Sequence, residues 1–473
     1  MMIDCTKKEL ELLQVIGECA QQLNVPCYLV GGFVRDKLLQ RDCKDIDCVC
    51  VGDGIALAHE VAARFTPQPQ VAFFKNFGTA NIKVDGFEVE FVGARKESYA
   101  AHSRKPEVEP GTLEDDQKRR DFTINALAIS LNKHDFGQLV DPFHGVEDLN
   151  LKIIRTPLDP GTTFSDDPLR MMRAIRFASQ LGFSILTETW LGIIEHADRI
   201  RIVSKERIAD EMNKIVLSPK PSVGFDLLYR SGLLKIIFPQ MVDLAGAEYI
   251  DGKGHKDNFY HTIQVLDNIS EHTTDLWLRW AAILHDIGKP ATKRFEQGHG
   301  WTFHGHEVVG GRMVPKIFTQ LKLPLNEKMK FVKKLVELHL RPICLTKENI
   351  TDSAIRRLLF DAGDDFDALM LLCNADITSK NQQKVQRYLQ NFEMVRMRCR
   401  EVEEKDHIRT WQPPITGEMI MQTFHVPPSK VVGDLKTAIK DAILDGHIEN
   451  TYEAAFAFML QKAREVNLVP VRE

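Results

Sequence analysis

The chain has 473 residues, too many for one hydrophobic core and enough for about three or four domains. Its 61 Lys and Arg against 66 Asp and Glu give a net charge of −5, which excludes a globally basic nucleic-acid binder and leaves any RNA contact to local patches. With no apolar run near the ~20 residues of a membrane span, no signal peptide and nine cysteines without a C-x-x-C pair, we expect reduced thiols in a cytoplasm and no membrane.

The first elements are expected to be short and to alternate between helix and strand. Residues 3–24 carry apolar residues at helical spacing, and Pro26 ends that pattern. The elements expected next are a buried strand at 28–30, a turn at Gly31 and Gly32, a helix at 33–39 and a second strand at 45–51.

The second strand begins with two carboxylates, Asp45 and Asp47. Residues two apart on a strand point to the same face, so these side chains repel each other unless a cation lies between them. Two divalent ions ~3.5–4 Å apart, bridged by carboxylates, form the usual catalytic centre for nucleotidyl transfer. Asp-x-Asp is more often a solvated strand edge, but the strand–Gly-Gly–helix–strand order and nearby Arg35 favour the metal interpretation.

The Gly31-Gly32 turn lies between a strand and a helix, where bare backbone N–H groups can bind phosphate oxygens. Alone, such a turn is usually only a turn. Residues 31–49, GGFVRDKLLQRDCKDIDCV, resemble the head motif of the DNA polymerase β nucleotidyltransferase superfamily, and in particular class II (bacterial-type) CCA-adding tRNA nucleotidyltransferases and their poly(A) polymerase relatives. Phe33 and Gln40 are mild departures from small residues of that motif.

The rest of the head is expected to hold a helix at 54–65 and strands at 71–73, 79–84 and 87–91, the last two joined by an Asp85-Gly86 turn. Glu90 is a candidate third carboxylate, and a solvent-facing strand residue is an equally good interpretation. Arg95–Lys118 is polar, with two prolines, which predicts a mobile loop. In the resembled family, a flexible loop at this place helps to change the nucleotide preference.

The basic cluster Lys118–Arg120 stands beside Asp121 at the start of an expected apolar helix. Arginine donors suit a triphosphate and a carboxylate suits a ribose, although an acidic residue in a first helical turn is also common. The match to the family motif RRDFTINAL implies Arg120 near phosphate and Asp121 near ribose. A strand and turn at 139–145 are expected to end the head, near Arg155.

The next informative stretch runs from Phe164 to Phe177, FSDDPLRMMRAIRF. Pro168 suits a first helical turn, so Asp167 can simply cap its own helix. The same geometry places Asp167 and Arg170 on one face, where a carboxylate can accept from the amino group of adenine or cytosine and a guanidinium can donate to the neighbouring ring atom. Guanine and uracil carry a carbonyl at that place and would be rejected.

This stretch resembles the family's EDxxR motif, with Asp166 in place of the first Glu. Arg173 and Arg176 continue the basic stripe and are expected to face phosphates. Helices are expected at 188–196, 206–216 and 221–231, with Arg207 and Glu211 as a structural i,i+4 pair.

A separate metal constellation extends over residues 255–376. An adjacent His-Asp pair at the end of an apolar helix is costly to bury unless it is paired or ligated, and imidazoles with carboxylates suit a transition metal. The H…HD…D order resembles the HD phosphohydrolase pattern, with Lys289 available to neutralise a phosphate. The ligands expected there are His261, His285, Asp286, His306, His339 and Asp376.

Together these features predict an α+β fold with a polymerase-β-like head (a small mixed sheet with helices), followed by an all-α neck, an HD domain and a helical tail. The expected boundaries are 1–155, 156–245, 246–385 and 386–473. The resemblance, over roughly residues 27–380, implies transfer of CMP and AMP from CTP and ATP to a tRNA 3′ end, with Mg²⁺ held by Asp45 and Asp47.

Two kinds of alternative remain open at this point. Within the class, the chain is a poly(A) polymerase or an enzyme that adds only CC or only A. From another class, it is an HD phosphohydrolase with an inactive RNA-binding head. A pure RNA-binding scaffold is disfavoured by two sets of metal-type side chains.

Overall fold

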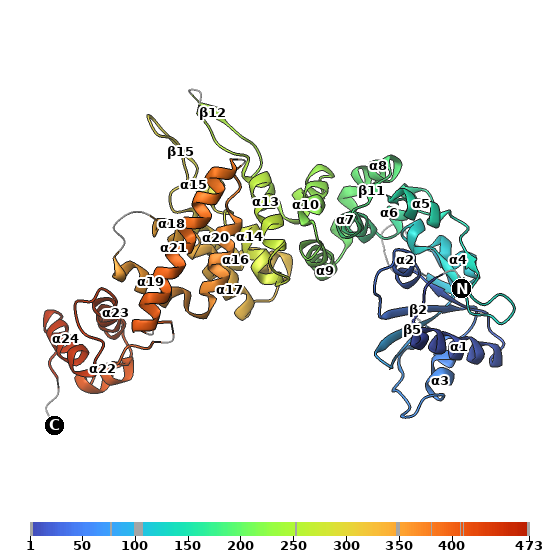
Figure 1. The fold of residues 1–473 in the computed structure, drawn as a ribbon, viewed down its shortest axis with the longest axis horizontal. Coiled ribbons are helices and arrows are strands. Elements are labelled where there is room, and N and C mark those ends of the chain that lie inside the picture. The colour runs from blue at the N-terminus through green and yellow to red at the C-terminus, as the bar shows by residue number, and fades with distance from the viewer. Residues whose placement is uncertain are drawn as a thin grey trace. The chain divides into compact units, whose positions relative to one another are not determined.

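A computed structural model provides the structure of the chain (Figure 1). It describes residues 3–75, 78–98, 107–250, 253–346, 351–379, 381–406, 408–409 and 411–470. The chain forms two compact units, Met1–Val242 and Asp243–Glu473, and each is described by itself. The division into four domains that the sequence predicts stays a prediction.

The first unit contains a seven-stranded mixed sheet in the order β3-β4-β5-β2-β1-β8-β9. Only β2 and β5 run parallel, and the other neighbours pair antiparallel. The sheet confirms the small mixed sheet expected from sequence. Its strands are β1 Cys27–Val30, β2 Asp45–Cys50, β3 Ala72–Phe74, β4 Thr79–Val84, β5 Phe87–Gly93, β8 Ala128–Ser130 and β9 Leu139–Val140.

Alternation along β2 decides which face is buried. Ile46, Cys48 and Cys50 are at most 1% exposed, whereas Asp45 and Asp47 project from the opposite face. Helix α3 (Gly54–Ala62) packs on β4 and β5 and on α1 (Lys7–Gln22). Since the apolar face lies under helices, the carboxylates are left on the other side of the sheet. Helix α2 (Gly32–Leu38) directly follows the strand β1.

The predicted loop Arg95–Lys118 is wrong for most of its described residues. β6 (Arg95–Ser98) pairs with β7 (Glu107–Pro110), and α4 (Leu113–Lys118) follows, with a capping box between Thr112 and Asp115. Residues 99–106 lie outside the described residues. Polar composition hid this hairpin because β6 and β7 offer no apolar alternation, and the Glu97 side chain is paired instead with Arg95 on its own strand and with Arg119.

The apolar helix expected after Asp121 is also wrong. Thr123–Asn125 form one 3-10 turn, η2, and the chain then enters β8. β8 pairs with both β1 and β9, and all three of its residues are buried. In a short apolar run that is buried on both sides, hydrophobic periodicity cannot distinguish a strand from a helix.

The remaining elements of this unit are mostly helices, and the three helices expected in the neck are confirmed within a residue as α8, α9 and α10. The elements are α5 Gly145–Leu151, β10 Ile153–Ile154, α6 Pro160–Asp166, α7 Leu169–Leu181, β11 Ser184–Ile185, α8 Thr187–His196, η3 Ala197–Ile202, α9 Lys205–Val216, α10 Pro221–Arg230, α11 Leu233–Ile237 and α12 Pro239–Val242.

Two local predictions in the neck need correction. Helix α7 begins after Pro168, one residue later than expected, although the Asp167 carboxylate still accepts from the Leu169 amide at 3.1 Å. The expected Arg207–Glu211 pair is wrong, because Glu211 contacts Arg176 at 2.9 Å and Lys214 at 3.3 Å. Helical spacing cannot show that a neighbouring helix offers a closer guanidinium.

The second unit is mostly helical. Its elements are β12 Tyr249–Ile250, β13 Lys253–Gly254, α13 Asn258–Ser270, α14 Leu276–Leu284, α15 Lys289–Thr292, β14 Arg294–Glu296, β15 Gly300–Thr302, α16 His306–Leu321, α17 Glu327–Leu338, α18 Arg341–Cys344, α19 Asp352–Ala362, η4 Gly363–Asp365, α20 Phe366–Ala375, α21 Gln382–Asp406, α22 Gly417–Phe424, α23 Lys430–Leu444 and α24 Tyr452–Glu465. Helices α22 to α24 share an apolar core around Ile439 and Met459.

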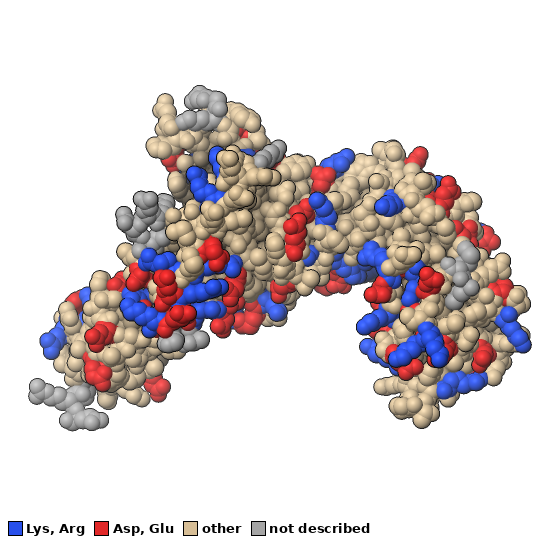
Figure 2. Space-filling model, viewed as in Figure 1, with Lys and Arg blue, Asp and Glu red and all other residues tan. Residues whose placement is uncertain are grey.

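Charges of both signs are interspersed on the face of the second unit that Figure 2 shows, over α19 and α21. Some form ion pairs between helices, such as Arg357 with Asp445 at 2.8 Å and Arg356 with Asp406 at 2.6 Å. The mixture agrees with the near-neutral balance of the sequence. Among the described helices, none combines the length and apolarity that a membrane span requires.

Candidate active site and metal centre

A polar pocket of about 570 Å³ lies in the first unit, where the open sheet face meets α2 and α7. It brings together ten residues that the sequence singles out for nucleotide or metal binding, and five that it does not. The residues singled out are Gly31, Gly32, Arg35, Asp45, Asp47, Glu90 (as a candidate third carboxylate), Arg120, Asp121, Arg173 and Arg176, and the others are Asn81, Glu88, Asn125, Phe177 and Gln180.

Strand register places four carboxylates on one face of the pocket. Asp45 stands opposite Glu88, and Asp47 stands opposite Glu90. Burial, together with Glu90 and Asp45, raises the pKa of Asp47 to about 6, although Arg120 opposes the shift. Burial also raises the pKa of Glu90. Two acids, Asp47 and Glu90, that are costly to ionise among other carboxylates are the arrangement that a bound cation relieves.

Gly31 is needed because of its backbone and its surroundings. Its φ of 71° disfavours other residues, and a Cβ there would lie 3.1 Å from Arg120 Nη1 and 3.3 Å from Asp47 Oδ2. Its N–H donates to the Leu127 carbonyl at 3.3 Å, so the expectation that this amide is bare is wrong. The glycine instead lets the strand pass close to the carboxylate and the guanidinium.

Asp121 is buried and already paired. It accepts from Arg173 Nε at 2.6 Å and from the Asn125 amide at 3.0 Å. Burial raises its pKa, but Arg173 and Asn125 outweigh burial and lower it to about 2. The carboxylate is therefore ionised and fixes the Arg173 side chain at the pocket.

Asp167 and Arg170 belong to a different place. In the part of the chain that the structure describes, neither residue lines the pocket. Arg170 Nη2 donates to the Arg119 carbonyl at 2.6 Å, and Asp167 lies 3.5 Å from an Arg207 nitrogen. Arg170 is one helical turn before Arg173 on α7, so it lies next to the pocket and not inside it.

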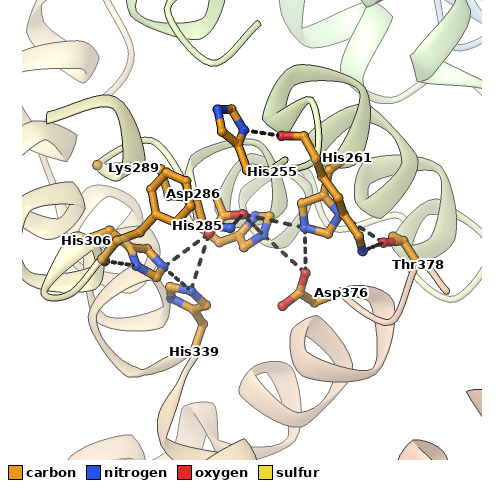
Figure 3. A network of polar contacts seen from close by, with 12 residues as sticks. His255, His261, His285, Asp286, Lys289, His306, His339, Asp376 and Thr378 are labelled. Atoms are coloured by element: carbon orange, nitrogen blue, oxygen red, sulfur yellow. Dashed lines mark hydrogen bonds and ion pairs between the residues drawn. The ribbon is translucent and has the colours of Figure 1, made fainter. Parts of the chain in front are cut away.

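The second unit gathers all six predicted HD residues into one centre (Figure 3). His261 Nε2 lies 2.9 Å from Asp376, and His285 Nε2 lies 3.2 Å from Asp286. Figure 3 shows His306 and His339 on one side of Asp286, with His261 and Asp376 on the other. His285 and Asp286 follow α14, as predicted, and Asp376 follows α20.

Hydrogen bonds from Nδ1 set the orientation of three histidine rings in the centre. Nδ1 of His285, His306 and His339 lies 2.6 to 2.8 Å from a backbone carbonyl, of Ala282, Phe303 and Val336 respectively. A carbonyl only accepts, so each Nδ1 carries a proton, and in the neutral ring each Nε2 presents a lone pair that can bind a metal. The Nε2 atoms of His306 and His339 are only 3.3 Å apart, which leaves two lone pairs facing each other unless a cation lies between.

The centre divides into two ligand sets that share Asp286. One is His261, His285 and Asp286, the other is Asp286, His306 and His339, and the ligand atoms of each lie within 4.8 Å of one another. Burial raises the pKa of Asp286, but His285, His306 and Lys289 hold it well below its usual range. Lys289 Nζ lies 2.6 Å from this carboxylate. The donor set fits a pair of transition-metal ions.

Three family models match consecutive parts of the chain. They are described as "Poly A polymerase head domain" at residues 27–155, "Probable RNA and SrmB- binding site of polymerase A" at 182–244, and "HD domain" at 258–369. The multifunctional CCA protein of Shewanella frigidimarina is 31% identical over 378 residues, which cover 75% of this chain and 84% of that protein.

The chain belongs to the tRNA nucleotidyltransferase and poly(A) polymerase family.

Two A-adding relatives of this tRNA nucleotidyltransferase are also similar. The A-adding tRNA nucleotidyltransferase of Deinococcus radiodurans is 30% identical over 367 residues, 75% of this chain and 81% of that protein. The A-adding enzyme of Aquifex aeolicus is 43% identical over 190 residues, and that match spans 38% of this chain and 23% of the Aquifex protein.

Solved structures confirm the fold of the tRNA nucleotidyltransferase. The CCA-adding enzyme of Bacillus stearothermophilus in complex with CTP has a TM-score of 0.68 at 22% identity and covers 98% of this chain and 99% of that one. A tRNA nucleotidyltransferase complexed with a primer tRNA and an incoming ATP analog has a TM-score of 0.58 at 24% identity, with 81% and 99% covered.

The residue of this nucleotidyltransferase that sequence reasoning missed most clearly is Phe177. Its ring carries three guanidinium groups, those of Arg176 at 4.3 Å, Arg35 at 4.8 Å and Arg173 at 5.5 Å. The spacing of Arg173 and Phe177, four apart on a helix, was the available signal. Arg35 also donates to the Asn125 side chain at 2.8 Å, which links α2 to η2.

Proposed function

We propose that this tRNA nucleotidyltransferase adds CMP and AMP, from CTP and ATP, to the 3′ end of tRNA without a nucleic-acid template. The observation that carries the proposal is the pocket in which Asp45, Asp47 and Glu90 face Arg120 and Arg173. Such a site offers carboxylates for a metal and guanidinium groups for a triphosphate. The names of its relatives, which add A or CCA, agree with this substrate class.

Asp45 and Asp47 would hold Mg²⁺, with Glu90 as a third candidate ligand. When bound, magnesium neutralises triphosphate charge and lowers the pKa of the attacking 3′ hydroxyl. Arg120 presents Nη1 beside Gly31 and Asp47, where it can donate to phosphate oxygens. Arg173, fixed by Asp121, is a second donor that does not need to reorganise when the nucleotide arrives.

Asp167 and Arg170 would read the base. Asp167 accepts from the amino group of adenine or cytosine, and Arg170 donates to the adjacent ring atom. A carbonyl presented to Asp167 leaves polar groups unpaired, at a cost of ~1–3 kcal/mol. The Arg207 contact of Asp167 is the one that the base would replace, while Arg170 keeps Nη2 on the Arg119 carbonyl and donates to the base from its other nitrogens.

The test is the length of the product on tRNA trimmed of its terminus, with labelled CTP and ATP supplied singly and together. We expect two C residues with CTP alone and a single A after them when both are present. Addition of A to tRNA that already ends in CC, with no addition of C to the trimmed tRNA, would establish the A-adding alternative that the Deinococcus and Aquifex relatives favour. Unlimited addition of A would establish a poly(A) polymerase and reject our proposal.

We propose that the HD centre is a second, metal-dependent site that hydrolyses phosphomonoesters or 2′,3′-cyclic phosphates. Its support is the convergence of the Nε2 atoms of His306 and His339 with the Asp286 carboxylate. A bound transition metal would supply an activated water at neutral pH. Lys289, which contacts Asp286 at 2.6 Å, would neutralise a phosphate. Metal analysis of the purified protein tests this, and a protein purified without chelators that holds no transition metal would contradict it.

The rival in which the head is inert gains no support from the pocket, since the predicted Asp45, Asp47 and Arg120 converge there. We further expect the enzyme to work in a reducing cytoplasm, because its nine cysteines are free thiols.

A further inference from the structure

A buried carboxylate outside the predicted site connects one of its arginines, Arg120, with the neighbouring Arg119. Asp116 lies in α4, and its side chain is 0% exposed. One of its oxygens binds Arg119, and the other binds Arg120. An acid that is removed from water this completely must be matched by charge and hydrogen bonds, and here both come from two adjacent guanidinium groups.

The Arg120 arm of this network reaches the triphosphate pocket. Nε and Nη2 of Arg120 lie 3.1 and 2.9 Å from Asp116 Oδ2. Its third nitrogen, Nη1, lies 3.1 Å from where a Cβ of Gly31 would stand, on the side of Asp47. Asp116 thus holds one edge of the planar guanidinium and turns the remaining nitrogen toward the pocket.

The Arg119 arm reaches the base-reading residue. The Arg119 side chain is held by Asp116 Oδ1 at 2.9 Å and by Glu97 at 3.4 Å, and Glu97 is 4% exposed. The backbone carbonyl of the same Arg119 accepts from Arg170 Nη2 at 2.6 Å. The position of that carbonyl, and with it the resting position of Arg170, depends on how the Arg119 residue is anchored.

We propose that Asp116 is a positioning residue that sets triphosphate alignment and base selection together, through Arg120 and through the Arg119 carbonyl. Glu97 contacts Arg119 at 3.4 Å, and we assign it to the base-selection arm alone. This inference rests on the proposed base-reading role of Arg170. Under this inference, a single side chain positions the groups that bind the phosphates and the groups that read the base.

A simpler role for Asp116 is local, since residues three and four apart on a helix commonly form ion pairs that stabilise its end. Such a role would change stability and leave base selection as it is. The ratio of kcat/KM for CTP over UTP therefore separates the two interpretations, because loss of helix stability affects both nucleotides alike.

The experiment compares Asp116→Asn and Glu97→Gln with Glu114→Gln, a control at an exposed position of the same helix. Single-nucleotide addition to end-trimmed tRNA is measured with CTP, ATP, UTP and GTP. For Asp116→Asn we expect the KM for CTP to rise about tenfold and the CTP-over-UTP ratio to fall about tenfold, the effect of one lost charge-assisted bond. For Glu97→Gln we expect the ratio to fall and the KM to stay within about twofold of the original enzyme.

A CTP-over-UTP ratio that stays unchanged in Glu97→Gln and in Asp116→Asn would overturn the inference. If Asp116→Asn does not fold, as a thermal melt would reveal, Glu97→Gln decides alone. Arg170→Ala separates this inference from the proposal it rests on. If Arg170→Ala keeps full base selection, base reading by Arg170 fails; if it loses selection while both carboxylate variants keep it, only the network inference fails.

Discussion

The two metal-type sites of this enzyme differ in how completely the protein builds them. In the HD centre four of the six ligands are buried, with His285 0% and Asp286 2% exposed, and backbone carbonyls fix three of the rings. In the head pocket, Asp45 is exposed and the carboxylates stand on an open strand face. Under our proposal, the first arrangement would be a complete ligand set and the second an incomplete one.

The difference has a chemical consequence. Magnesium usually keeps several waters and binds through one or two carboxylates plus substrate phosphates, whereas a cage of imidazoles retains a transition metal by itself. We therefore expect the head to acquire its ion together with the triphosphate and the HD centre to hold its ions at rest. The enzyme would thus bind one metal in the head only together with the nucleotide, and hold another in the HD centre without substrate.

The largest effect that tests this comparison is expected from Asp45→Ala combined with Asp47→Ala. Nucleotide incorporation should fall about a thousandfold or more, because the metal supplies several kcal/mol of charge stabilisation. The transition-metal content should not change, since the HD ligands lie in the other unit. Asp42→Ala, an exposed acid close in sequence, is the matched control and should keep both properties. Incorporation that survives the double change would rule out the mechanism.

The HD centre can be dissected by its shared ligand. Asp286→Asn should empty both ligand sets, whereas His339→Ala should remove one ion and leave the set of His261 and His285. Elemental analysis of purified protein checks the ratio, with His304→Ala as an exposed control. Equal metal loss in Asp286→Asn and His339→Ala would contradict two sets. Nucleotide incorporation should be unaffected throughout, as the comparison of the two sites requires.

A smaller effect is expected from Arg170→Ala, which changes the base reader and neither metal site. The preference for CTP and ATP over UTP and GTP should fall about 10- to 100-fold, the range for lost polar discrimination. The kcat/KM of each nucleotide on end-trimmed tRNA measures it, and Arg201→Ala on the exposed side of the neck is the control. A uniform loss with all four nucleotides would show that Arg170 binds phosphate instead.

The smallest effect concerns the pH dependence of stability. Arg173 and Asn125 outweigh burial and hold the pKa of Asp121 at about 2, below its unfolded value near 4. A depressed pKa stabilises the fold above pH ~4, and this contribution of about 2 kcal/mol is lost as the pH falls from ~4 toward ~2. The difference in urea midpoint between the original enzyme and Asp121→Asn should be similar at pH 7 and 5 and smaller at pH 3. A difference that grows on acidification would refute the assignment.

Much of both sites follows from sequence, because strand alternation alone predicts that Asp45 and Asp47 share a face, and β2 confirms it. The six HD residues were likewise expected from their order along the chain and meet in one centre. Contacts between separate helices and strands could not be predicted from local sequence patterns. Glu88 enters the pocket only because β5 runs parallel to β2, and no local pattern specifies that pairing.

The hairpin of β6 and β7 is a second case in which local sequence pattern did not predict the structure. Its polar composition is that of a loop, yet Glu97 is buried against Arg95 and Arg119. The prediction failed because ion pairs between distant residues replaced the apolar alternation on which strand prediction depends. Phe177, likewise, is an ordinary apolar helix residue until three arginines from two helices are seen to stack on it.

The most direct test is a crystal structure with a non-hydrolysable CTP analogue and Mn²⁺ in place of Mg²⁺, with anomalous scattering to locate the ions. We predict manganese between the Asp45 and Asp47 carboxylates and the phosphates in the head, and no manganese there when the analogue is omitted. A triphosphate bound in the pocket with both carboxylates turned away and no ion between them would contradict the account.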